Sequence, residues 1–188
     1  RHLWFLVIFF IYGTGTVSAQ VQTGADQTAL YLPLLKDRSV GVVANHTSMI
    51  GQTHLVDSLL GSGIEVVKIF GPEHGFRGDA ADGTKLSDDL DPETGIPVIS
   101  LYGSKRKPSA EDVADLDIMV YDIQDVGTRC YTYISTLQYV MEVCAENGIP
   151  CLVLDRPNPN GFYVDGPMLD TTQYRSFIGL NAIPLVYP

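Results

Sequence analysis

The sequence predicts an α/β protein with a mostly parallel sheet and helices on both faces. Short apolar runs alternate about five times with segments of helical periodicity, which is typical of successive β–α–β units. The apolar runs are nearly continuous, as expected of strands that are covered on both faces. The composition, 45% hydrophobic and 18% charged, is that of a globular protein large enough to bury a core.

The first half of the chain supplies two strands and two helices. Apolar residues three or four apart predict a short helix over 28–35, which contains Pro33. The apolar run over 39–45 predicts the first strand. Leucines on one side predict a helix over 53–60, and the run over 65–70 predicts the second strand.

The second half continues the alternation. Further strands are predicted over 96–101, 117–122 and 151–155. Before the second of these, Ser109 and Asp112 have a spacing close to that of a capping box, which predicts a helix over 109–116.

The best helical pattern in the chain ends at Gly148. Its apolar stripe has the spacing of one helix face and comprises Ile134, Leu137, Met141 and Cys144. Close to the last residue, 183–188 has the pattern of another strand with no helix after it. We therefore expect this chain to be the first part of a longer protein.

The first 19 residues have the pattern of a signal peptide. Arg1 and His2 precede an apolar run over 3–11, and Val17-Ser-Ala19 has the small residues of a signal-peptidase site. An uncleaved anchor is the alternative, but the run is short for a bilayer core of about 30 Å. We therefore expect a periplasmic or secreted protein of a bacterium, without a stable membrane anchor.

Charge and cysteine content bear on other classes of function. A formal net charge of −10 argues against a nucleic-acid groove, which needs clustered Lys and Arg. Cys130, Cys144 and Cys151 lack the spacing of metal ligands. Cys144 and Cys151 have the spacing to pair across a helix-to-strand turn. Because Cys130 and Cys144 fall in a helical pattern and resemble small core residues, we expect no obligatory disulfide.

The loop after the second strand is the first candidate for a functional site. Residues 69–78 combine three glycines with Glu73, His74 and Arg77, and Pro72 ends the strand. The acidic stretch 79–95 follows without periodicity, and we expect a long functional loop there.

Three other strands end in polar clusters. Asn45 and His46 follow the first strand, the cluster 122–129 begins at Asp122, and the cluster 155–161 begins at Asp155. Because the carboxyl ends of parallel strands share one edge of a sheet, these clusters and the Glu73 loop are expected to converge. Structural alternatives remain open, since Asp122 and Asp125 could pair with Arg129 and Asp155 could cap a turn.

Two carboxyl groups across a cleft, one protonated and one ionised, are the groups that glycoside hydrolysis uses. Phe70 and Phe76 flank Glu73, and burial beside them would favour its protonated form. A metal site is less well supported, because adjacent Glu73 and His74 point in opposed directions and no His-x-x-x-His pair is present. We expect no cofactor, since the chain has no nucleotide-binding glycine motif.

Three motifs resemble those of the exo-β-N-acetylmuramidases, a glycoside hydrolase family of peptidoglycan degradation. They are Gly71-Pro-Glu-His-Gly-Phe-Arg-Gly78, then Tyr121-Asp-Ile-Gln-Asp-Val-Gly-Thr-Arg129 with Tyr131-Thr-Tyr-Ile-Ser135, and Leu154-Asp-Arg-Pro-Asn-Pro159. The resemblance runs from about residue 39 to residue 188. It implies that residues 20–188 form a Rossmann-like N-terminal catalytic domain, with a smaller C-terminal domain across the active-site cleft.

The resemblance also implies an activity, the removal of β-1,4-linked N-acetylmuramic acid (MurNAc) from the non-reducing end of peptidoglycan fragments. It makes Glu73 the general acid and leaves Asp122, Asp125 and Asp155 as candidates for a second acidic role, with Asp122 or Asp155 first. One departure is Asp165 before Gly166, where the family often has Glu.

The remaining candidates are expected to bind substrate. One arginine of Arg77, Arg129 and Arg156 would pair with the lactyl carboxylate that distinguishes MurNAc from GlcNAc. The other predicted substrate-binding residues are Asn45, His46, His74, Asp125, Tyr131 and Asn158. Two rival functions remain, a metal-dependent cell-wall amidase and a non-catalytic cell-wall sugar-binding protein.

Overall fold

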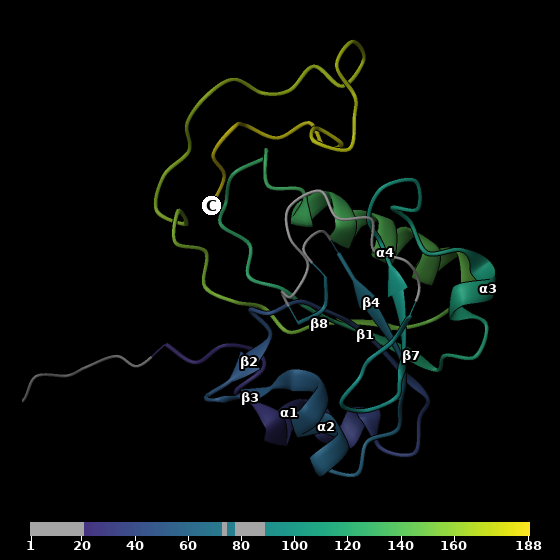
Figure 1. The fold of residues 1–188 in the computed structure, drawn as a ribbon. Helices are drawn as coiled ribbons and strands as arrows, with labels where there is room; N and C mark the ends of the chain where they lie inside the picture. Colours follow the sequence, from purple (N-terminus) through teal and green to yellow (C-terminus); the bar gives the residue numbers. More distant parts are fainter. Residues whose placement is uncertain (1–20, 73–74, 78–88) are drawn as a thin grey trace, which may run out of the picture.

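The computed structural model describes residues 21–72, 75–77 and 89–188 (Figure 1). Three of the sequence predictions therefore fall wholly or mostly outside the described residues. These are the signal peptide at 1–19, the pair Glu73 and His74, and most of the acidic stretch 79–95.

The fold is built on a six-stranded sheet in the order β5-β6-β4-β1-β7-β8. In that order the strands are Asp89–Leu90, Pro97–Ser100, Val66–Gly71, Val40–Ala44, Ile118–Asp122 and Cys151–Val153. All neighbours are parallel except β5, which runs antiparallel to β6. The predicted mostly parallel α/β fold is therefore confirmed.

The order of the parallel strands places a topological switch point beside β1. The chain first builds outward from β1 through β4 to β6, and then returns to the other side of β1 to add β7 and β8. Crossovers on the two sides of β1 therefore leave in opposite directions. In open α/β sheets, ligands bind outside the carboxyl ends of the strands at such a point.

Helices cover both faces of the sheet, as predicted (Figure 1). Helices α1 (Thr28–Leu35) and α2 (Leu55–Gly61) pack on one face, and α3 (Ala110–Val113) and α4 (Tyr133–Asn147) pack on the other. Among the described residues, none of the helices has both the length and the apolar character needed to cross a bilayer.

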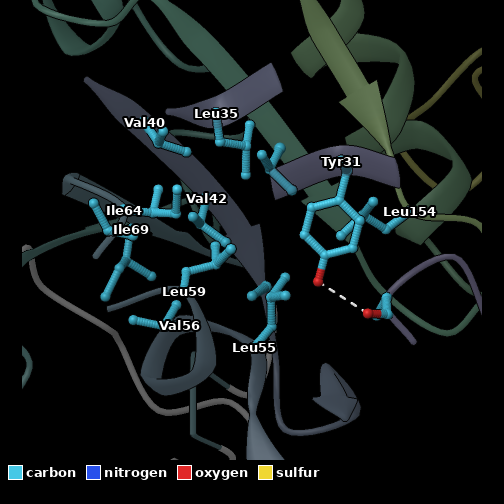
Figure 2. Packing of buried hydrophobic residues seen from close by; sticks show 14 of the residues in the cluster. Tyr31, Leu35, Val40, Val42, Leu55, Val56, Leu59, Ile64, Ile69 and Leu154 are labelled. Atoms are coloured by element: carbon cyan, nitrogen blue, oxygen red, sulfur yellow. Dashed lines mark hydrogen bonds between the residues drawn. The ribbon is translucent and has the colours of Figure 1, made fainter. Parts of the chain in front are cut away.

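Strand β1 lies at the centre of the sheet, and all five of its residues are buried. Val40 and Val42 face α1 and α2, while Val43 faces α3 and α4. Figure 2 shows the first of these clusters, in which Tyr31 packs among aliphatic side chains and its hydroxyl donates to the Ala25 carbonyl at 2.9 Å. A buried hydroxyl that finds an acceptor costs little, so Tyr31 fixes the segment that precedes α1.

Local signals explain where the helices of the second face begin and end. Ser109 and Asp112 form both halves of the capping box at the start of α3, which confirms that prediction. Gly148 ends α4 in the left-handed conformation, with a φ of 68°. The predicted apolar stripe of α4 is only partly right, because Met141 is 51% exposed. The buried face consists of Ser135, Thr136, Val140, Val143 and Cys144.

The sequence prediction of a helix from residue 53 is wrong at its start. Met49–Ile50 and Thr53–His54 form a two-stranded antiparallel hairpin, β2 and β3, and α2 begins only at Leu55. Gly51 makes the tight turn with a φ of 59°. This hairpin brings residues 46–54 back over the carboxyl end of β1.

Residues 154–188 contain no regular helix or strand, so the strand predicted over 183–188 is not formed. Val186 makes only isolated bridges to Thr128 and Asp165. The segment is held instead by polar contacts, since the Tyr187 hydroxyl lies 2.8 and 2.9 Å from the two carboxylate oxygens of Asp125. Asn158 Nδ2 also donates to the Tyr187 carbonyl at 2.9 Å.

Strand β5 is joined to the loop after β4 by a buried ion pair. Arg77 Nε and Nη2 donate to the two oxygens of Asp91 at 2.8 and 2.9 Å. The Asp91 carboxylate also accepts from the backbone and hydroxyl of Thr94. These hydrogen bonds to the charged form lower the pKa of Asp91 to about 2.

This lowered pKa predicts an acid-sensitive contribution to stability. Because the folded pKa lies below the unfolded one, the contribution is present above about pH 4 and is lost as the pH falls through about 2. We expect it to be worth about 2 kcal/mol. Urea unfolding of the wild type and of Asp91→Asn, repeated across this pH range, will measure it.

A matched control is Asp115→Asn, because this carboxylate is 60% exposed and forms an ion pair with Lys68 at the surface. The stability difference between wild type and Asp91→Asn is expected to shrink with acid, whereas that of Asp115→Asn stays small throughout. A difference that is constant with pH at Asp91 would contradict the assignment.

Candidate active site

Asn45 lies at the switch point, directly after β1, and is fully buried. Its Oδ1 accepts from the Thr47 amide at 2.9 Å and from the Thr47 hydroxyl at 2.6 Å. Its Nδ2 is buried and has no hydrogen-bond partner among the residues that the structure describes. An unpaired buried donor is costly, and such groups cluster where a protein binds something else.

Asp122 ends β7 next to Asn45 and is bound by Arg156 from the loop after β8. Arg156 Nε and Nη2 donate to the two Asp122 oxygens at 2.6 and 2.9 Å, and Nη2 also donates to the Met49 carbonyl of the hairpin. Both side chains are almost inaccessible. Burial raises the pKa of Asp122, and the hydrogen bonds from Arg156 oppose that rise.

His54 is a site residue that the sequence reasoning missed. Its Nδ1 accepts from the Val56 amide and caps α2, so Nε2 carries the proton and donates to the Asn45 carbonyl at 2.9 Å. Burial lowers the pKa of His54, which keeps the ring neutral, and its edge packs on Phe76. The usable hairpin signal was Gly51 before Gln52, because glycine at the first central position is typical of a two-residue hairpin turn.

A hollow of about 350 Å³ opens beside His54. Predicted residues His46 and Arg77 line it, together with Met49, Gln52, Asp57 and Glu93. Besides its pair with Asp91, Arg77 contacts Asp57 at 3.1 Å and Glu93 at 3.4 Å. Three carboxylates therefore surround one guanidinium, and the hollow is acidic overall.

The side chains of Asp125 and Asn158 bind other parts of the chain instead of facing open space. Asp125 accepts from the Tyr187 hydroxyl and from the Gly127 amide at 2.8 Å. A Cβ at Gly127 would lie 2.4 Å from the Asn158 side chain, so this contact requires glycine. The structure thus brings both residues to the same edge, in a network that fastens residues 158–187 to the loop after β7.

Arg129 differs from the other two predicted arginines. Its Nη1 donates to the carbonyls of Pro167 and Ile183, and no carboxylate of the described residues lies within ion-pair distance. The side chain lines a second hollow, of about 260 Å³, together with Tyr174 and Ser176. Tyr131, which follows in the same loop, is 54% exposed. Cys130 was expected in a helix core but is exposed in the loop before α4.

Asp155 follows β8 and is exposed. Its carbonyl accepts from the Gly24 amide, and a Cβ at Gly24 would lie 2.6 Å from the Asp155 amide. The structure shows no hydrogen bond to its carboxylate from the described residues. Glu73 and His74 lie outside the described residues, between Pro72, which is buried at the end of β4, and Phe76.

The described edge is therefore rich in hydrogen-bonding groups and mixed in charge. Within residues 21–72, 75–77 and 89–188, no three His, Cys, Asp or Glu side chains are grouped as a metal ion would require. Buried amide, imidazole and carboxylate groups around open hollows can bind a polar ligand with many hydroxyls, such as a sugar.

Comparison with known proteins gives a consistent result. Residues 40–188 match the family described as exo-β-N-acetylmuramidase NamZ, N-terminal. The chain is 48% identical over 173 residues to the peptidoglycan β-N-acetylmuramidase NamZ of Bacillus subtilis strain 168, which covers 88% of this chain and 41% of the relative.

Two crystal structures of DUF1343 family proteins from Bacteroides fragilis NCTC 9343 have the same fold. BF0379 is 46% identical with a TM-score of 0.77, and BF0371 is 39% identical with a TM-score of 0.80. Each comparison covers 88% of this chain and 42% of the solved chain, so this chain spans about two fifths of the length of its relatives. The protein therefore belongs to the NamZ exo-β-N-acetylmuramidase family, and its residues 40–188 correspond to that family's N-terminal part.

Proposed function

We propose that the protein is an exo-acting glycoside hydrolase that removes β-1,4-linked MurNAc from the non-reducing end of peptidoglycan fragments. The observation that carries the proposal is the 48% identity to a peptidoglycan β-N-acetylmuramidase across 88% of this chain. The switch-point edge, with its buried polar groups and the hollow beside His54, supports it as a place for a sugar. Glu73 is the proposed general acid.

Asp155 is the better candidate than Asp122 for the second catalytic carboxylate. Both oxygens of Asp122 are bound to Arg156, and the side chain has no exposed surface. A carboxylate so placed can orient neighbours but cannot reach water or a sugar carbon. Asp155 is exposed at the same edge, so we assign Asp122 to positioning and Asp155 to chemistry.

The anomeric outcome follows from the separation of the two carboxyl groups. A retaining enzyme holds them about 5 Å apart, and an inverting enzyme about 6.5–9.5 Å apart to admit a water molecule.

The lactyl carboxylate of MurNAc is best matched by Arg129. Arg77 and Arg156 are already neutralised by Asp91 and Asp122, whereas Arg129 binds only carbonyls among the described residues. Its remaining N–H groups can therefore form a charge-assisted fork with a ligand carboxylate. The hydroxyls of Tyr174 and Ser176 line the same hollow, and Leu169 and Ile178 offer apolar surface to a methyl group.

The acidic hollow beside His54 suits a different part of the substrate. Asp57 and Glu93 line this hollow beside Arg77, so they would repel an anion there but can accept hydrogen bonds from hydroxyls. We propose that neutral sugar hydroxyls bind this hollow. We also propose that the enzyme acts outside the cytoplasm, because peptidoglycan lies there and residues 1–19 have the sequence pattern of a signal peptide.

The first test replaces the proposed general acid. Glu73→Gln is expected to lower turnover of the 4-nitrophenyl β-glycoside of MurNAc by about 10²–10⁴-fold, because proton donation to the leaving oxygen is lost. Release of 4-nitrophenol by the full-length protein measures the effect.

Glu65→Gln is the matched control for this test. Glu65 is exposed at the opposite end of β4, so its replacement should leave turnover unchanged. Full activity of Glu73→Gln would remove Glu73 from the mechanism. Loss of wild-type turnover in EDTA with rescue by zinc would instead favour the metal hydrolase, and a folded but inactive wild type would favour the sugar-binding protein.

A second test separates positioning from chemistry. Asp155→Asn is expected to lower kcat by about 10²-fold or more while unfolding like the wild type. Asp122→Asn leaves the Arg156 charge buried without its partner, so it should destabilise the protein by about 3–5 kcal/mol. Urea unfolding and kcat are measured for both variants, and the reverse pattern would exchange their roles.

A third test addresses recognition of the lactyl group. Arg129→Gln is expected to weaken competitive inhibition by free MurNAc by about 10-fold or more, with little change for GlcNAc, because the charge-assisted fork is lost. The ratio of the two inhibition constants is the readout, since general damage to the site changes both alike. Arg38→Gln, an exposed change at the opposite edge, is the control. An unchanged ratio for Arg129→Gln would rule out this role.

A further inference from the structure

The turn between α4 and β8 brings two cysteines together. The Ile149 amide donates to the Cys144 carbonyl at 2.9 Å, and the Gly148 amide donates to the Ala145 carbonyl. These two bonds form a Schellman motif, which reverses the chain within a few residues. Cys151 follows Ile149 by two residues. In an extended segment, the side chains of Ile149 and Cys151 therefore point to the same side.

Packing confirms that this side faces the helix. Ile149 and Cys151 both pack against the buried cluster that contains Cys144 and Val143 of α4. The side chains of Cys144 and Cys151 therefore lie at one cluster between α4 and β8. Both cysteines are free.

The two thiols are not equivalent. Cys144 is almost fully buried, whereas Cys151 is half-buried at the start of the edge strand. The interaction between the two thiols lowers the pKa of Cys151 and, together with burial, raises that of Cys144. Cys151 is therefore the more accessible and the more acidic of the two thiols. Accessibility and acidity are the properties of an attacking nucleophile.

We propose that Cys144 and Cys151 form an intramolecular disulfide when the protein meets a disulfide oxidant. The Cys151 thiolate attacks one sulfur of the oxidant, whose S–S bond breaks and releases one thiol. The Cys144 sulfur then attacks the Cys151 sulfur of this mixed disulfide and releases the second thiol. The two cysteines lose two electrons to the oxidant, and their two protons pass to the thiols that leave.

The bond would fasten an edge element next to the active site. Strand β8 has only three residues, and within the described part of the chain it is an edge strand that pairs with β7. The loop after β8 contains Asp155, the proposed second catalytic carboxylate, and Arg156, which pairs with Asp122. A disulfide that closes the short loop from residue 144 to 151 restricts the unfolded chain and holds the start of β8 to α4.

The test uses full-length protein purified reduced and then treated with oxidised glutathione. Free thiols are alkylated in denaturant, and the protein is cut with an endoproteinase specific for Glu. Cleavage after Glu142 and Glu146 separates the three cysteines onto different peptides. We expect a linked pair of peptides that carries Cys144 and Cys151, lighter by two hydrogen atoms than the reduced pair, while Cys130 stays alkylated.

Oxidation is also expected to raise the Tm by about 5 °C, an effect that dithiothreitol reverses. Cys151→Ser should abolish both the linked peptide and the Tm change, and because residue 151 is only half-buried this variant is expected to fold. Cys130→Ala should retain both. Complete alkylation of Cys144 and Cys151 after oxidation, or pairing of either with Cys130, would overturn the proposed disulfide. An unchanged Tm would overturn the claim that the disulfide stabilises the position of β8.

Discussion

The bidentate ion pair between Asp122 and Arg156 is the interaction on which the edge of this sheet depends. It joins the end of β7 to the loop after β8, and through the Met49 carbonyl it also holds the β2–β3 hairpin over β1. Both charges are buried, so their desolvation is repaid only by this geometry. Three segments that are distant in sequence are therefore positioned by one contact, and the contact lies at the switch point where a ligand is expected.

Charge compensation divides the polar residues of this edge into two groups. Arg77 and Arg156 each have buried carboxylate partners, and their role is to hold β5, the hairpin and the loop after β8 in place. Arg129 has none among the described residues, although it fixes two carbonyls of the C-terminal segment. An arginine with a fixed position and an unpaired charge is prepared for an anion, because the entropy of ordering the side chain is already lost in the free protein.

Sequence reasoning succeeded where the signal is local. The five parallel strands, the capping box of Ser109 and the Gly148 end of α4 each depend on a few adjacent residues, and the structure has all of them. It failed where a distant partner decides. Nothing near Arg77 in sequence shows that Asp57 and Asp91 neutralise it, and the polar Ser135 and Thr136 hid the buried face of α4. The hairpin was missed because strands of two residues show almost no alternation. His54 was therefore included in the predicted helix over 53–60, whereas it is the residue that caps α2.

The weakest element of the sheet carries a large part of the site. Strand β8 contributes three residues at an edge, yet the loop that follows it supplies Asp155 and Arg156. Backbone pairing over so short a length cannot fix that loop by itself, since each hydrogen bond contributes only about 1 kcal/mol net. The position of Asp155 is set instead from both ends of the strand. The Arg156–Asp122 pair acts at one end, and the turn that packs Cys151 against the cluster containing Cys144 acts at the other. Substitutions at these two ends of β8 can therefore change the position of the proposed second carboxylate while Asp155 itself is kept.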